Sequence, residues 1–76
     1  EIEKIKLNIF PNPTSLLWQI KSPKLIELCE VYDLLGKKII SEKHYSKEIN
    51  IDGSDLPSGV YILVINKIYK LRLVKK

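Results

Sequence analysis

Apolar and polar residues alternate along most of this chain, and turn-forming residues interrupt the alternation about every 8–12 residues. A period of two places successive side chains on opposite faces of a β-strand, whereas a helix repeats its apolar residues every three or four positions. No stretch has a strong helical period. The alternation therefore predicts an all-β domain, a β-sandwich of about seven short antiparallel strands, over residues 5–9, 16–20, 25–32, 39–44, 49–51, 60–65 and 69–73.

Proline, glycine and asparagine mark the breaks between these runs. Pro11-Asn12-Pro13 forces an extended or turning backbone after the first run, and Ser22-Pro23 is expected to end the second. Asp33-Leu34-Leu35-Gly36-Lys37 predicts a hairpin in which Gly36 takes a positive φ. A double turn over residues 52–59 and a tight turn at Asn66-Lys67 precede the last two strands.

The chain has 76 residues, of which 45% are hydrophobic, so it is long enough for one domain with a thin core. A domain of this size buries only about 60% of the surface that its unfolded chain exposes, which leaves no room for a deep substrate cleft. We expect residues 1–6 to be the end of a linker and the start of the first strand, and residues 7–76 to form the domain.

The charged and apolar residues argue against two classes of partner, nucleic acid and membrane. The net charge of +4 comes almost wholly from lysines spread along the chain, and Arg72 is the only arginine. Because nucleic-acid readers rely on arginine for bidentate contacts, we expect no nucleic-acid partner. No apolar run approaches the roughly 20 residues of a membrane helix, so we expect no stable membrane insertion. We expect no signal peptide at the charged start, and a signal for export could lie upstream of it.

Few side chains here could perform chemistry. Cys29, the only cysteine, can form no internal disulfide and is expected to be a buried, unreactive thiol. His44, the only histidine, has no cysteine at metal-ligand spacing and is expected at a solvated strand end. No spacing marks the nucleophile and base of a catalytic triad. We therefore expect a protein that is not an enzyme and needs no cofactor.

One segment resembles a calcium loop only in part. Glu48, Asn50, Asp52 and Gly53 occupy the first, third, fifth and sixth positions of an EF-hand-like loop. The twelfth position, which requires a bidentate glutamate, is Gly59. The segment therefore predicts a turn closed by an aspartate side chain, and we expect no metal site.

Two surfaces could serve a partner instead. If Tyr61, Leu63 and Ile65 face the core, then Val60, Ile62 and Val64 face away from it, so a second layer or a partner would have to cover them. The aromatic side chains offer the second surface, as a sugar-binding face; this is the alternative function, an accessory carbohydrate-binding module, and it would be built from Trp18, Tyr32, Tyr61 and Tyr69.

Four motifs in order resemble a known family. They are Pro11-Asn12-Pro13, then Val31-Tyr32-Asp33-Leu34-Leu35-Gly36-Lys37, then Leu56-Pro57-Ser58-Gly59-Val60-Tyr61, and last Lys70-Leu71-Arg72-Leu73-Val74-Lys75-Lys76. Each motif alone is weak, but their order and spacing resemble the C-terminal sorting domain (type A) of proteins exported by the type IX secretion system of Bacteroidetes. The resemblance runs from about Leu7 to Lys76.

The resemblance implies a fold and a function. The fold is a seven-stranded, immunoglobulin-like β-sandwich. The function is a non-catalytic sorting signal that follows a larger, N-terminal cargo, is recognised by the outer-membrane translocon after passage through the periplasm, and is removed by a sortase-like peptidase in many cargos. The cargo is then released or held at the cell surface.

The family's motif residues carry over individually. The matching positions are Pro11, Asn12, Pro13, Asp33, Gly36, Lys37, Leu56, Pro57, Gly59, Tyr61, Lys70, Leu71, Lys75 and Lys76. One departure follows the first motif: most members have a glycine soon after it, whereas this chain has Ser15-Leu16-Leu17. The resemblance implies that sorting depends most on the terminal segment, which a partner could read by its charge or by pairing with its edge.

Overall fold

The computed structural model describes residues 6–76 and contains five strands. They are β1 (Asn8–Phe10), β2 (Leu17–Tyr32), β3 (Lys38–Asp52), β4 (Gly59–Ile65) and β5 (Tyr69–Lys75). All paired strands are antiparallel and belong to one sheet in the order β1-β2-β4-β5, with β3 on the other side of β2. The all-β prediction is therefore confirmed for the described residues, and no helix that could cross a membrane occurs among them.

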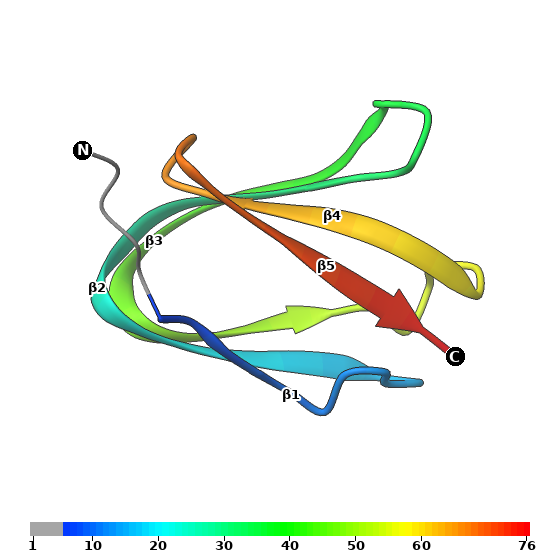
Figure 1. Ribbon diagram of the computed structural model, residues 1–76, viewed down its shortest axis with the longest axis horizontal. Helices are drawn as coiled ribbons and strands as arrows, with labels where there is room; N and C mark the ends of the chain where they lie inside the picture. Colours follow the sequence, from blue (N-terminus) through cyan, green and yellow to red (C-terminus); the bar gives the residue numbers. More distant parts are fainter. Residues whose placement is uncertain (1–5) are drawn as a thin grey trace.

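The two longest strands curl the sheet over on itself (Figure 1). β2 and β3 pair along most of their length, from Leu17 with Asp52 to Tyr32 with Lys38. On its other edge, β2 pairs first with β1 and, after the bend, with β4. A parallel bridge between Thr14 and Lys75 then joins the segment after β1 to the end of β5, so the two margins of the curled sheet meet.

Matched serines allow both long strands to bend without ending. Ser22 Oγ accepts a hydrogen bond from the amide of Lys24 and donates one to its carbonyl oxygen, and Ser46 makes the same two bonds with Glu48. The ladder shifts register here, between the pairs Lys21 with Glu48 and Ile26 with Ser46. Pro23 falls inside this irregularity, where its missing N–H removes no regular ladder bond.

These bends correct the predicted strand count. The runs at 16–20 and 25–32 form one strand, as do those at 39–44 and 49–51, so the described residues contain five strands and not about seven. The immunoglobulin-like sandwich is not confirmed either, because all five strands belong to one curled sheet. Residues 1–5 of the expected linker and first strand lie outside the described residues.

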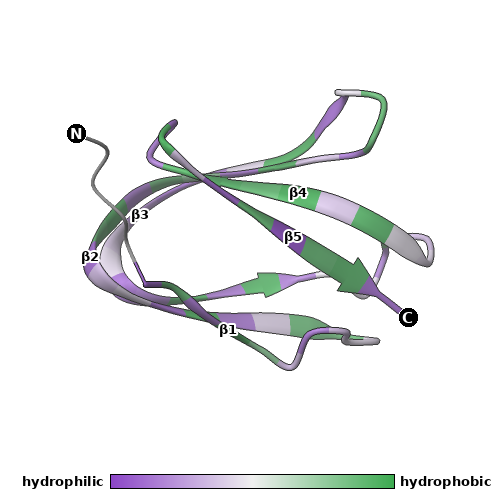
Figure 2. Ribbon diagram, in the orientation of Figure 1, coloured by the Kyte–Doolittle hydropathy of each residue, from purple (hydrophilic) through white to green (hydrophobic). Residues whose placement is uncertain are grey.

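The inside of the curl holds the core, and the alternation that predicts it is visible along the strands in Figure 2. Cys29 and Val31 point inward as expected. The expected inward residues of β4 are also buried. The apolar side chains of this core are Trp18, Ile20, Ile26, Cys29, Val31, Ile49, Ile51, Tyr61, Leu63, Ile65 and Leu73, and Val64 is buried outside this cluster.

Candidate functional site

The first motif is fastened to the last strand. Asn12 Nδ2 donates to the carbonyl oxygen of Arg72 at 3.1 Å, and Asn12 Oδ1 accepts from the amide of Val74 at 2.8 Å. Two backbone bonds continue the contact, from the amide of Thr14 to the Val74 carbonyl and from the amide of Lys76 to the Thr14 carbonyl. We call these bonds of Asn12 and Thr14 to β5 the clamp. Pro11 and Pro13, both exposed and both preceded by cis peptide bonds, lie on either side of Asn12.

This clamp narrows how a partner could read the last strand. Asn12 and Thr14 occupy polar groups on the edge of β5 that β4 leaves free. A partner strand that paired along Val74 would first have to displace them. Pairing with the whole edge, one of the two modes expected from the sequence, therefore conflicts with the closed end of β5.

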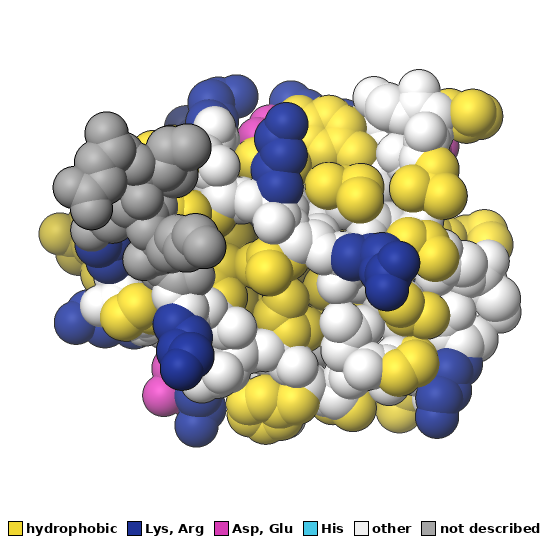
Figure 3. All heavy atoms as spheres, viewed as in Figure 1, with side chains coloured by type: hydrophobic (Ala, Val, Ile, Leu, Met, Phe, Trp, Pro, Cys, Tyr) yellow, Lys and Arg dark blue, Asp and Glu magenta, His cyan; other side chains and the backbone are white. Residues whose placement is uncertain are grey.

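The terminal motif itself divides between the two faces of β5. Leu71, Leu73 and Lys75 point inward, whereas Lys70 and Arg72 are exposed, as is Lys76 beyond the strand. Figure 3 shows lysine and arginine side chains scattered among apolar ones over the viewed face, without one continuous basic patch. The strand therefore offers a partner separate cations and not a concentrated positive surface.

Lys75 is not part of an exposed basic end. Lys75 is only 7% exposed, and its Nζ donates to the carbonyl oxygen of Leu56 at 2.6 Å. Its aliphatic stem is buried while its amine satisfies an acceptor in the third motif. The structure thus assigns this lysine to holding two motifs together.

The third motif forms a braced turn beside this contact. Tyr61 is nearly buried, and its hydroxyl donates to the carbonyl oxygen of Pro57 at 2.5 Å. Leu56 packs against the core, and Gly59 begins β4 with a φ of 150°. The first, third and fourth motifs therefore meet around the end of β5.

The second motif forms the β2–β3 hairpin, away from that clamp. Asp33 Oδ1 accepts from the amides of Leu35 and Lys37, each at 2.9 Å, and the Asp33 backbone bonds both Gly36 and Lys37. Gly36 has a φ of 89°, as the sequence predicted, in a region that strains side-chain-bearing residues. Lys37 is exposed, and the two leucines at the tip, Leu34 and Leu35, are 66% and 95% exposed.

The proposed sugar-binding face does not form. Trp18 is fully buried and Tyr61 is 6% exposed, so neither can stack on a sugar. The half-buried tyrosines also point in different directions. Tyr69 packs against the core, while Tyr32 faces outward, with Lys38 Nζ 5.9 Å from the centre of its ring.

The cysteine and the histidine lie in surroundings that do not form a reactive site. Burial, together with the charges of Glu42 and Glu30, raises the pKa of the Cys29 thiol from 9.0 to about 12. His44 lies within β3 and not at a strand end, and its Nε2 is 2.9 Å from Glu42 Oε1. Residues 6–76 contain no cluster of three or more histidine, cysteine or acidic side chains that could hold a metal ion.

The calcium-like segment is a turn, as predicted. Asp52 Oδ1 accepts from the amide of Ser54 at 2.9 Å, and this bond is the main cause of a lowered Asp52 pKa. The amide of Gly53 bonds the carbonyl of Leu16 at 2.7 Å. A Cβ on Gly53 would lie 2.5 Å from a ring carbon of Trp18, so only glycine lets this turn approach the buried indole.

The roles of two residues, Thr14 and Glu30, were not predicted from the sequence. Thr14 is buried and bonds both Val74 and Lys76 through its backbone, which no side-chain pattern could reveal. Glu30 is only 2% exposed, and its Oε2 lies 2.8 Å from Lys38 Nζ. That hydrogen bond is the main cause of a lowered Glu30 pKa. A glutamate among apolar residues was the available signal, because such a residue needs a cation.

A comparison with known families gives a match over nearly the whole described part of the chain. Residues 8–76 match the family described as the secretion system C-terminal sorting domain. The chain belongs to this family. No curated protein and no solved structure gives a significant match.

Membership confirms the resemblance drawn from the motifs and defines the function in outline. The domain is a C-terminal sorting signal for type IX secretion, which directs export toward the cell surface or the medium. Its family implies an interaction with that secretion system and a fused cargo upstream. Sorting domains of this kind are generally non-catalytic.

Proposed function

We propose that the outer-membrane translocon of the type IX system reads this domain in its folded state, as a non-catalytic address on an N-terminal cargo. The cargo reaches the translocon through the periplasm. A sortase-like peptidase then removes the domain, and the cargo is released or retained at the cell surface. The domain supplies the signal and no catalytic group.

The convergence of three motifs on β5 is the observation that carries this proposal. Asn12 holds Arg72 and Val74, and Lys75 holds Leu56, so the motif residues fix the backbone of the last strand. The side chains left to a partner are the exposed cations Lys70, Arg72 and Lys76. Because the strand backbone is already ordered, binding has to order only these side chains.

The experiment is export of a periplasmic reporter fused to residues 1–76, in a type IX-competent strain and in a strain that lacks the translocon. We expect surface reporter only in the competent strain. Removal of residues 71–76 would not test recognition cleanly, because it also removes the buried Leu73. The triple variant Lys70→Ala, Arg72→Ala, Lys76→Ala keeps the core and is expected to lower export.

A matched triple variant controls for the loss of charge. Lys6, Lys43 and Lys47 are exposed and lie away from β5, and their replacement by alanine removes the same net charge. We expect this variant to export like the parent. Equal export from both strains would contradict the proposed function, and equal loss in both triples would show that net charge, and not the terminal strand, is read.

A further inference from the structure

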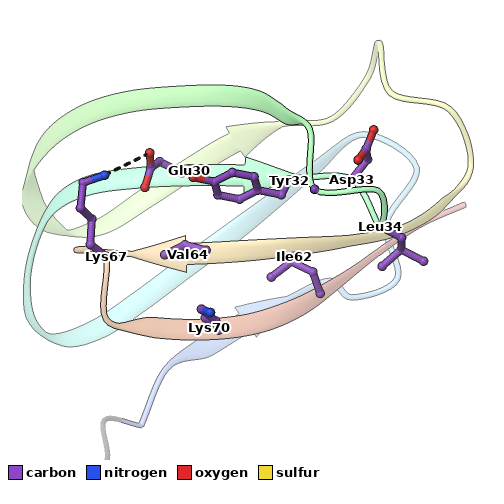
Figure 4. A pocket seen from close by; sticks show the side chains of 9 residues that line it. Glu30, Tyr32, Asp33, Leu34, Ile62, Val64, Lys67 and Lys70 are labelled. Atoms are coloured by element: carbon purple, nitrogen blue, oxygen red, sulfur yellow. Dashed lines mark ion pairs between the residues drawn. The ribbon is translucent and has the colours of Figure 1, made fainter.

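A shallow groove of about 530 Å³ lies on the outer face of the sheet, across β2, β4 and β5 (Figure 4). Its floor follows the strand register. Tyr32 pairs with Ile62, and Val64 lies between Glu30 on β2 and Lys70 on β5. Ile62 and Val64, two of the three outer apolar residues of β4 that the sequence marked as needing a cover, thus form the floor of this groove, and Val60 lies outside it.

The carboxylates of the groove are already engaged. Glu30 Oε2 lies 2.8 Å from Lys38 Nζ and 3.7 Å from Lys67 Nζ. Asp33 Oδ1 accepts two backbone amides of its own hairpin. Lys70, by contrast, forms an ion pair with no carboxylate of residues 6–76, and the Lys67 side chain is 69% exposed. Three lysines, Lys38, Lys67 and Lys70, thus stand against two carboxylates, Glu30 and Asp33, and the excess positive charge lies on the side of the exposed Lys70.

The hairpin adds an apolar wall in a fixed position. Leu34 lines the groove, and its neighbour Leu35 is almost fully exposed. The bonds of Asp33 and the positive φ of Gly36 fix this tip. Exposed apolar side chains on an ordered loop bind at a lower entropic cost than those on a mobile loop. They are also a typical sign of a protein-binding surface.

We propose that this groove binds a protein segment that combines apolar side chains with aspartate or glutamate. The apolar residues would cover Ile62 and Leu34, beside the already buried Val64, and the carboxylates would face Lys67 and Lys70. A second copy of the domain fits less well, because a symmetric dimer through this face would bring the same lysines of both copies together. The inference rests on the proposed function in that the segment belongs to the machinery that reads the folded domain.

A variant of the apolar wall tests the surface. Leu34→Ser, Leu35→Ser and Ile62→Thr, combined in the reporter fusion, remove apolar contacts and keep a β-branched residue in β4. The matched control is Tyr45→Ser, Ile68→Ser and Val60→Thr, in which two highly exposed apolar residues and a residue of the same strand face change outside the groove. Thermal unfolding of both purified variants verifies that each is folded.

We expect surface reporter to fall roughly tenfold in the groove variant and to change little in the control. A loss of this size corresponds to about tenfold weaker binding at the groove. Full export of the groove variant, or an equal loss in the control, would overturn the inference. Either result leaves the proposed function standing as long as export of the parent fusion depends on the translocon. Loss of that dependence would instead contradict the proposed function.

Photo-crosslinking identifies the chemistry of the occupant. A benzophenone amino acid replaces Leu35 in the exported fusion, and replaces Tyr45 as the matched control. We expect Leu35 alone to crosslink to one defined protein segment in which carboxylates adjoin apolar residues, as read by mass spectrometry. A crosslink to lipid, to carbohydrate or to a second copy, or no specific crosslink in exporting cells, contradicts the proposal.

Discussion

The closed end of β5 and the projecting end of the β2–β3 hairpin use their motif residues in different ways (Figure 1). Around the end of β5, Asn12 and Lys75 join segments that are distant in the sequence, and most of their polar groups are engaged within the domain. At the β2–β3 hairpin, Asp33 bonds only its own turn, and the residues beside it remain exposed. The first end closes the fold, and the second projects from it.

The contrast distinguishes residues that fix the backbone from residues that face solvent. In both places the motif side chain fixes the backbone, and its neighbours face solvent. These neighbours are Arg72 at the closed end, and Leu34 and Leu35 at the projecting end. Asn12 and Asp33 therefore act through the structure that they stabilise, whereas a partner meets Lys70 and Lys76 of the terminal motif together with these exposed neighbours.

The largest expected effect is at the closed end. Leu73→Ala removes a fully buried side chain from β5 and should lower the free energy of unfolding by about 2–5 kcal/mol. A domain of this size is stable by only roughly 4–11 kcal/mol, so the variant approaches unfolding. Urea denaturation of the purified domain measures this change. Leu35→Ala, which is exposed, is the control, and an equal loss in both would contradict the assignment of Leu73 to the core.

Loss of the clamp should have the next largest effect. Asn12→Ala removes two bonds that join residues 60 and 62 positions apart, and we expect a loss of about 1–3 kcal/mol. Hydrogen exchange should accelerate first at the amide of Val74, which Asn12 protects. Asn50→Ala, at an exposed position of β3, is the control. Unchanged exchange at Val74 would show that the clamp does not hold β5.

A smaller, local effect is expected at the projecting end. Asp33→Ala removes two bonds that span only two and four residues, so we expect a loss of about 0.5–1.5 kcal/mol, with faster exchange confined to the hairpin. Asp55→Ala, in an exposed turn, is the control. If Asp33→Ala destabilised the domain more than Asn12→Ala, the comparison between the two ends would be reversed.

The smallest expected effect concerns pH. The folded-state pKa of Glu30 is lowered, chiefly by its hydrogen bond with Lys38, below the ordinary value of 4.5. Its contribution to stability is therefore present above pH 4.5 and is lost as the pH falls through the lowered pKa. Glu30→Gln should weaken the fall in melting temperature between about pH 5 and 3. An unchanged pH profile would show that the Glu30–Lys38 pair contributes nothing to the stability of the domain.

Sequence alone predicted the local features well. The period of two identified the inward residues Cys29 and Val31, and the turn chemistry identified Gly36 and the Asp52 turn. These features depend on neighbouring residues, whose side-chain geometry is fixed by the backbone itself.

Contacts between distant segments were harder to predict. Ser22-Pro23 ends a strand in most settings, but here Ser22 and Ser46 support bends at the same level of two paired strands. Lys75 appeared to belong to a solvated basic end, although its amine finds a carbonyl 19 residues away. No period or motif specifies such partners, because they arise only when the sheet curls.

The central claim is that the folded domain, and not a linear run of motif residues, is the signal. Ile20→Asp tests it directly, because it places a charge at a fully buried site outside every motif and should unfold the domain. Gln19→Asp, at the exposed neighbour, is the matched control, and immunoblotting verifies that both fusions persist in the periplasm. The measurement is surface reporter in a type IX-competent strain. We predict export with Gln19→Asp and none with Ile20→Asp; parental export of an unfolded Ile20→Asp fusion would contradict the claim.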